Sequence, residues 1–184
     1  VRAAIAGVFR TELGFSGLEA PMVLYTSDDR TTTVDCDVSV SGNFLTVAGQ
    51  PRVVLTVSDI TAQKRTQREL ELPDDRVVEI ERVRTADGVP VMLETNSFPL
   101  AYSDLLQADL SQSLYAVLEG RGITPKRGIH EISLHYATNA QARLLEVDPG
   151  QALLLLREVV FDQHGRPLHT SYQLIRGDRF TFRI

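Results

Sequence analysis

The chain has little cysteine, no long apolar run and no excess of positive charge. Cys36 is its only cysteine, which excludes an internal disulfide and a zinc cluster held by several thiolates. The longest apolar run, Ala152 to Leu156, is far shorter than the roughly 20 residues of a membrane-spanning helix. The net charge of −5 argues against a large basic face for nucleic-acid phosphates. We therefore expect a soluble, cytoplasmic chain without membrane contact, and a DNA-reading segment only outside this sequence.

The motifs of common catalytic sites are also missing. The sequence has no Gly-x-Ser-x-Gly elbow, no His-Glu-x-x-His pair and no phosphate-cradling glycine loop, and Cys36 has no histidine signature near it. A protein that only binds a small molecule needs none of these motifs. We predict that the chain is not an enzyme and that it uses neither a cofactor nor a metal.

Alternating apolar residues predict strands joined mainly by hairpins. The expected strands are 22–26, 32–40, 52–57, 76–84, 91–95, 129–136, 152–161, 168–175 and 179–184, with turns at Gly42-Asn43, Gly49-Gln50-Pro51 and Asp87-Gly88. Helical spacing is expected over 1–9, 59–70, 104–120 and 140–146. This order predicts an α+β fold with a largely antiparallel sheet, one face of which is covered by the few helices.

The chain is expected to divide into an N-terminal fragment, 1–50, and a second domain, 51–184. Within the second domain, Leu72–Arg82 and Val147–Arg157 have the same spacing. Each runs from a helix end into a strand that ends in arginine, and each return strand begins with proline and an aliphatic residue. This predicts an internal pseudo-twofold repeat with a ligand site at its seam. The alternative is a chance similarity between two hairpins.

Arg82 and Arg84 are the most informative candidate site residues. They lie two apart on one expected strand and share a face with the apolar Val78 and Ile80, so both should point inward. A buried guanidinium needs a partner, and arginine binds phosphate or carboxylate through paired hydrogen bonds. A ligand anion would satisfy both residues. Neutralisation by acids of the chain itself, such as Glu94, is an equally good explanation.

Four further residues are candidates at the same site. Ser113 and Tyr115 fall at the start of an expected helix, where free backbone N–H groups favour an anion, although simple capping by Ser111 is the alternative. Glu94 is a candidate acceptor for ligand hydroxyls. A strict two-residue turn places it opposite Glu81, whereas a three-residue loop places it opposite Ile80 on the arginine face, which we favour. His169 begins an inward-facing return strand and is also a candidate.

Several separate motifs occur in the order seen in UTRA domains, the effector-binding domains of GntR-type regulators of the HutC subfamily. They are Val83-Arg84-Thr85-Ala86-Asp87-Gly88-Val89-Pro90-Val91, Phe98-Pro99, Ser113-Leu114-Tyr115, Val147-Asp148-Pro149-Gly150, Leu155-Leu156-Arg157 and Arg176-Gly177-Asp178-Arg179-Phe180-Thr181-Phe182. Residues 69–184 carry the resemblance, and Arg52–Leu72 is expected to form the first strand and helix of the same domain.

The resemblance implies a chorismate-lyase-like fold, a homodimer and a pocket for a small anionic metabolite such as a sugar phosphate. It also implies a winged helix-turn-helix domain outside this chain, whose DNA binding the ligand would weaken. Phosphate-holding roles carry over onto Arg82, Arg84, Ser113 and Tyr115, and the acid of the return strand is Glu94. Many relatives have glutamate where this chain has His169, which is a departure from the family pattern.

Residues 56–65 also resemble the closing strand and exit helix of a PAS domain. Because the resemblance to UTRA domains covers more of the chain, the leading hypothesis is the effector-sensing domain of a transcription regulator. The alternatives are a lyase-like enzyme on the same fold, and a PAS-type sensory or dimerisation module.

Overall fold

A computed structural model describes residues 2–11, 13–25 and 33–180 of the chain. Its contacts divide the chain into two compact units, 1–65 and 66–184, each described here by itself. None of the helices in these described ranges is long and apolar enough to cross a membrane.

Unit 1 is a three-stranded antiparallel sheet with one helix. Its elements are α1 (Arg2–Thr11), β1 (Phe15–Tyr25), β2 (Thr33–Val47) and β3 (Gln50–Asp59), with the strand order β1-β2-β3. A small core of Cys36, Val38 and Val40 lies on one face of β2, because every second side chain of a strand points to the same side. The helix α2 (Thr61–Glu69) follows and crosses the boundary between the units.

The turn expected at Gly42-Asn43 is wrong, because β2 continues through both residues. Gly42 is required there for a different reason: a Cβ at this position would collide with the ring of Phe15 on β1. The β2–β3 turn is formed by Ala48-Gly49, one residue earlier than expected. Both residues have positive φ, as a two-residue hairpin turn requires.

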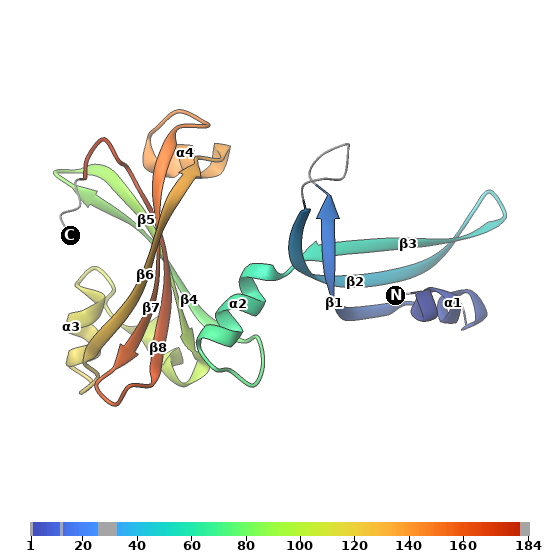
Figure 1. Ribbon diagram of the computed structural model, residues 1–184, viewed down its shortest axis with the longest axis horizontal. Coiled ribbons are helices and arrows are strands. Elements are labelled where there is room, and N and C mark those ends of the chain that lie inside the picture. Colours follow the sequence, from blue (N-terminus) through green and yellow to red (C-terminus); the bar gives the residue numbers. More distant parts are fainter. Residues whose placement is uncertain (1, 12, 26–32, 181–184) are drawn as a thin grey trace. The chain divides into compact units, whose positions relative to one another are not determined.

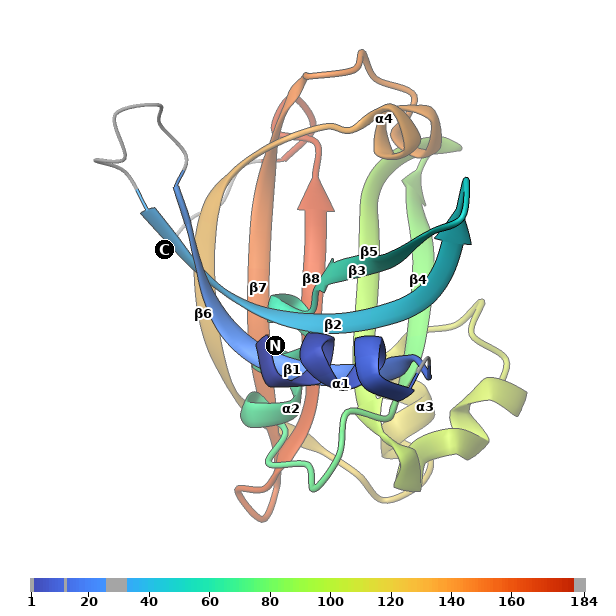
Figure 2. The ribbon, with the colours of Figure 1, turned by 90° about the vertical axis from the view of Figure 1, so that its right-hand side faces the viewer.

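Unit 2 is a five-stranded antiparallel sheet in the order β4-β5-β8-β7-β6, seen face-on in Figure 2. Its elements are β4 (Val77–Ala86), β5 (Val89–Pro99), the 3-10 helix η1 (Leu100–Gln107), α3 (Leu114–Glu119), β6 (Pro125–Tyr136), α4 (Asn139–Leu145), β7 (Ala152–Asp162) and β8 (Pro167–Ile175). The α+β class with a largely antiparallel sheet is confirmed. The sheet order sets hairpins β4–β5 and β7–β8 side by side, but the pseudo-twofold repeat stays a prediction.

The helices of unit 2 cover both faces of the sheet, so the expectation of one covered face is wrong. Leu105, Leu114 and Leu118 from η1 and α3 pack with Phe98 of β5. Leu145 of α4 belongs to a second core with Leu93, Leu153 and Leu174. Phe98 and Leu93 are five residues apart on β5 and therefore point to opposite faces. Figure 1 shows η1 and α3 near one end of the strands and α4 near the other.

The final strand expected over 179–184 is not formed in its described part. Residues 177–179 form a turn after β8, and 181–184 lie outside the described residues.

Candidate functional site

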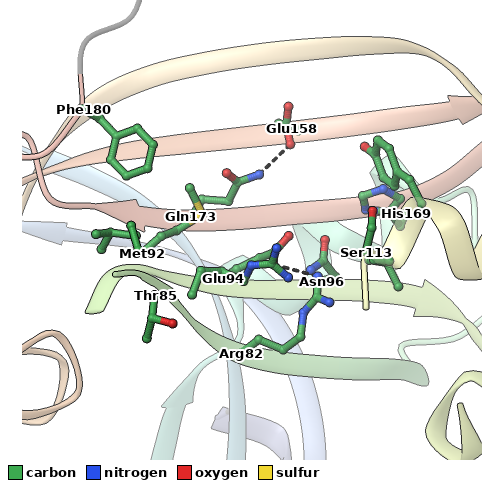
Figure 3. A pocket seen from close by; sticks show the side chains of 15 residues that line it. Arg82, Thr85, Met92, Glu94, Asn96, Ser113, Glu158, His169, Gln173 and Phe180 are labelled. Carbon is green, nitrogen blue, oxygen red and sulfur yellow. Dashed lines mark hydrogen bonds and ion pairs between the residues drawn. The ribbon is translucent and has the colours of Figure 1, made fainter. Parts of the chain in front are cut away.

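A cavity of about 520 Å³ opens on the face of the unit 2 sheet that also carries η1 and α3. Strands β4, β5, β7 and β8, the start of α3 and Phe180 supply its walls (Figure 3). Among its lining residues are all six candidates from the sequence: Arg82, Arg84, Glu94, Ser113, Tyr115 and His169. The fold therefore brings together in one place residues that are far apart along the chain.

The β4–β5 hairpin sets the position of Glu94. Asp87 and Gly88 form a two-residue turn with positive φ at both positions, and the register shifts by one residue between Arg84 and Thr85. This bulge turns the following residues of β5 to the other face. Glu94 is therefore opposite Arg82, not Ile80 as expected, but it lies on the expected face.

Arg82 and Glu94 form an ion pair across this hairpin, 2.8 Å from Nη2 to Oε2, with side chains 12% and 15% exposed. The Arg82 guanidinium also donates to the carbonyl of Leu110 at 3.5 Å, and its buried Nε has no hydrogen-bond partner. The sequence left open whether a ligand anion or an acid of the chain itself neutralises Arg82. In the structure the partner is Glu94, an acid of the chain.

Arg84 lies at the exposed edge of the cavity, and not in the shielded position expected for it. The reason is its place near the end of the edge strand β4, beyond Val78 and Ile80, which pack with η1 and α3. Within the described ranges its guanidinium has no ion-pair or hydrogen-bond partner. The charges that line the cavity sum to zero, because the carboxylates of Glu94 and Glu158 equal the guanidinium groups of Arg82 and Arg84 in number. The positive charge without a partner, that of Arg84, lies at the mouth.

The start of α3 brings two hydroxyl groups to the mouth. Ser113 is the N-cap residue by its backbone, but its side chain makes no capping hydrogen bond. The expected cap by Ser111 is wrong, since the Ser111 hydroxyl donates to Asp109 at 2.6 Å. Burial raises the pKa of the Tyr115 phenol to about 12, and the negative charges of Glu158 and Glu94 add to this rise. Tyr115 therefore stays a hydrogen-bond donor at neutral pH.

His169 forms part of the cavity floor and is 1% exposed. Its ring lies against Phe98, with centroids 4.9 Å apart, and meets Tyr115 edge-on at 6.0 Å. Burial lowers the pKa of His169 to about 4, against smaller opposing effects of the Thr170 carbonyl and of Glu94. The imidazole is therefore neutral at physiological pH.

Four polar residues of the cavity were missed by the sequence reasoning: Thr85, Asn96, Glu158 and Gln173. Gln173 donates to Glu158 at 2.7 Å, as Figure 3 shows, and the other oxygen of Glu158 is 2.7 Å from His130 Nδ1. Asn96 could have been found, because it lies two residues after Glu94 on the same strand. Glu158 and Gln173 could not, because their positions depend on the pairing of β8 with β5 and β7.

Comparison with known proteins assigns the region that carries the cavity to a known family. Residues 52–181 match the family model of the UTRA domain. The HTH-type transcriptional repressor PhnF of Mycolicibacterium smegmatis is 35% identical over 134 residues, which cover 71% of this chain and 55% of PhnF. The HTH-type transcriptional repressor NagR of Bacillus subtilis is 29% identical over 105 residues, 56% of this chain and 43% of NagR. The chain spans about half the length of these two repressors.

A solved structure supports the same relationship. The crystal structure of the effector domain of PhnF from Mycobacterium smegmatis superposes with a TM-score of 0.60 at 26% identity, covering 99% of this chain and 90% of that one. The family match begins at residue 52, close to the boundary expected at 50/51, whereas contacts group all of β3 with unit 1. Since the match extends over most of the sequence, the chain belongs to the UTRA family, the effector domains of GntR/HutC-type transcription regulators.

Proposed function

We propose that this UTRA domain senses a small anionic metabolite, a sugar phosphate or a carboxylate, and that the anion binds at the mouth of the cavity. The observation that carries the proposal is the unpaired guanidinium of Arg84, which lines the same cavity as the hydroxyl groups of Ser113 and Tyr115. Charge-assisted hydrogen bonds from arginine to phosphate or carboxylate are among the strongest that proteins form. Ser113 and Tyr115 supply neutral donors to the same anion.

The neutralised interior supports this placement of the anion. Arg82 already has Glu94 as a partner, and Glu158 on β7 adds a further negative charge to the cavity. An anion deep in the cavity would meet these carboxylates, whereas an anion at the mouth meets Arg84 first. The deeper polar groups remain available for the uncharged part of the ligand.

The wider role of the protein follows from its relatives and is part of the proposal. PhnF and NagR are named as HTH-type repressors, and the matched region covers only part of each. We infer a homodimer that is linked to DNA through a winged helix-turn-helix domain outside this sequence. If the ligand binds more tightly to the arrangement that has released the DNA, it lowers the affinity for the operator. The operator then lowers the affinity for the ligand by the same factor, as linkage requires.

The test is a binding measurement on the whole chain with glucose 6-phosphate, ribose 5-phosphate, glycerol 3-phosphate, gluconate and citrate as probes. At least one probe should raise the melting temperature and bind in calorimetry without being turned over. Arg84→Gln should weaken that binding about 10-fold or more, since a hydrogen bond to a charged group contributes about 1.5–3 kcal/mol.

Arg143→Gln is the matched control, because it removes the same charge from an exposed arginine on α4. It should leave binding unchanged. The proposal fails if none of the five probes binds, or if Arg143→Gln weakens binding as much as Arg84→Gln does.

A further inference from the structure

Among the residues that the structure describes, three nitrogen atoms buried at the cavity have no hydrogen-bond partner: Arg82 Nε, Asn96 Nδ2 and His169 Nε2. Asn96 and His169 are each 1% exposed, so bulk water does not reach these groups in the free protein. Buried polar groups in folded proteins are nearly always paired, because an unpaired one loses its hydration without compensation. All three residues line the same cavity, so a molecule bound there can supply the missing partner.

The contacts of His169 show whether its unpaired nitrogen, Nε2, donates or accepts a hydrogen bond. Its Nδ1 lies 3.3 Å from the carbonyl oxygen of Thr170. A carbonyl oxygen only accepts, so the proton of the neutral imidazole is on Nδ1. His169 Nε2 then carries a lone pair and no proton, and it can only accept a hydrogen bond.

Asn96 supplies the opposite role nearby. Its Nδ2 can only donate. Asn96 on β5 is directly opposite Ser171 of β8, and His169 lies two residues from Ser171 on the same face. Side chains in such a diagonal relationship are about 7–8 Å apart at their bases, a gap that a small ligand group can bridge. Figure 3 shows both side chains at the cavity, with Ser113 beside them.

We propose that Asn96 and His169 form a subsite for a hydroxyl group of the effector, which donates to His169 Nε2 and accepts from Asn96 Nδ2. This inference rests on the proposed function, because the same molecule carries its anion to Arg84. It narrows the ligand to a molecule with an anion at one end and a neutral hydroxyl group at the other.

The two roles exclude other end groups on chemical grounds. An ammonium group can donate to His169 but cannot accept from Asn96. A carboxylate can accept from Asn96 but places its lone pairs against that of His169 Nε2. A methyl group satisfies neither nitrogen, so that both remain unpaired in the complex. Only a group that both donates and accepts, such as a hydroxyl, pairs both atoms.

The experiment varies only this end group. The probes are straight-chain alkyl phosphates of two to six carbons that end in a hydroxyl, ammonium, carboxylate or methyl group. Their affinities for the whole chain are measured by ligand-observed NMR and calorimetry. At the best chain length, the hydroxyl-ended phosphate should bind about tenfold more tightly than the methyl-ended one. A tighter ammonium-ended or methyl-ended probe would overturn the subsite while leaving the anion site at Arg84 intact.

Two histidine variants locate the effect. In His169→Gln the amide oxygen can reach the position of Nε2 and restore an acceptor, whereas the shorter side chain of His169→Asn cannot. The preference for hydroxyl over methyl should persist in His169→Gln and become smaller in His169→Asn, where only the bond from Asn96 remains, with the affinity for the methyl-ended probe unchanged in both. Equal preferences in the two variants would contradict the assignment.

Asn96→Asp provides an independent check, because it replaces the donor by an acceptor of the same shape. Its added charge lowers the affinity of all the phosphates, so the order of the end groups is the readout. A hydroxyl has one proton for two acceptors, whereas an ammonium group donates to both, so the ammonium-ended probe should become the tightest binder of the four. An unchanged order would contradict the subsite. If no phosphate of any end group binds the unmodified chain, the proposed function has failed for phosphorylated ligands. That result differs from every outcome that overturns the subsite alone.

Discussion

Arg82 and Glu94 are paired across the β4–β5 hairpin at 2.8 Å, and both side chains are largely buried at the edge of the cavity. The two side chains therefore neutralise each other in the absence of a ligand. The cavity keeps a positive charge without a partner only at Arg84. The pair is thus part of the cavity wall, and the negative charge of Glu94 opposes the approach of an anion to Arg82.

Removing the charge of Glu94 should have opposite effects on stability and on binding. Glu94→Gln leaves the Arg82 guanidinium without its counter-charge, and we expect the free energy of unfolding to fall by about 2 kcal/mol. The same variant should bind glucose 6-phosphate, or whichever anionic probe binds the unmodified chain, more tightly. Urea unfolding and calorimetry measure the two effects. Glu81→Gln, an exposed position on the same hairpin, should change neither.

His169 should make the stability of unit 2 depend on pH. Its pKa falls from 6.5 to about 4 on folding, chiefly through burial, so between these values the unfolded chain binds more protons than the folded one. Stability therefore decreases as the pH falls from 7 to 5, and the contribution of this residue is about 2 kcal/mol. His169→Gln should remove that part of the pH dependence, whereas His164→Gln in the exposed β7–β8 turn should not. Unfolding curves at the two pH values that are alike for His169→Gln and the unmodified chain would contradict this prediction.

Asp162 should stabilise the β7–β8 hairpin mainly through backbone hydrogen bonds. Its buried carboxylate accepts from the backbone N–H groups of His164 at 2.8 Å and Arg166 at 2.9 Å, and it pairs with the Arg166 side chain, which is 71% exposed. Asp162→Ala leaves those groups without an acceptor and should cost about 2 kcal/mol. Arg166→Ala loses only an exposed ion-pair partner and should cost less than about 1 kcal/mol. Equal losses in chemical unfolding would show that the ion pair dominates.

The contribution of Asp162 should also disappear in acid. Burial raises the pKa of its carboxyl group, but the hydrogen bonds from Arg166 and His164 lower it more, and the net shift is downward. A depressed pKa stabilises the fold above the unfolded value of about 4 and loses that effect as the pH falls below it. The stability difference between the unmodified chain and Asp162→Ala should therefore shrink between pH 5 and pH 2.

The same substitution at two glycines of unit 1 should have effects of opposite sign. Gly42→Ala places a methyl group against the ring of Phe15 and should lower the free energy of unfolding by about 1–2 kcal/mol. Gly7→Ala meets nothing within 4 Å on α1 and should raise it by about 0.5–1 kcal/mol, because alanine favours a helix. Neither change should alter probe binding in unit 2, since none of the cavity residues belongs to unit 1. A loss of binding with Gly42→Ala would contradict that independence.

The sequence by itself determined what depends on neighbours along the chain. Alternation and the Asp87-Gly88 turn fixed the β4–β5 hairpin, and Thr138 caps the adjacent helix α4 through its own side chain. The motifs from Val83 to Phe182 identified the family, because a motif is a local pattern. The shared face of Arg82 and Glu94 also followed, once a loosened register near the turn was assumed.

Tertiary structure alone decided which of these residues are buried, paired or free. Whether Arg82 meets Glu94 depends on one bulge, and the exposure of Arg84 depends on where η1 and α3 stop covering the sheet. Glu158 and Gln173 reach the cavity only because β8 lies between β5 and β7, strands that are distant in sequence. Periodicity along one strand shows which face a side chain takes, but a partner on another strand is set by packing, to which the whole chain contributes.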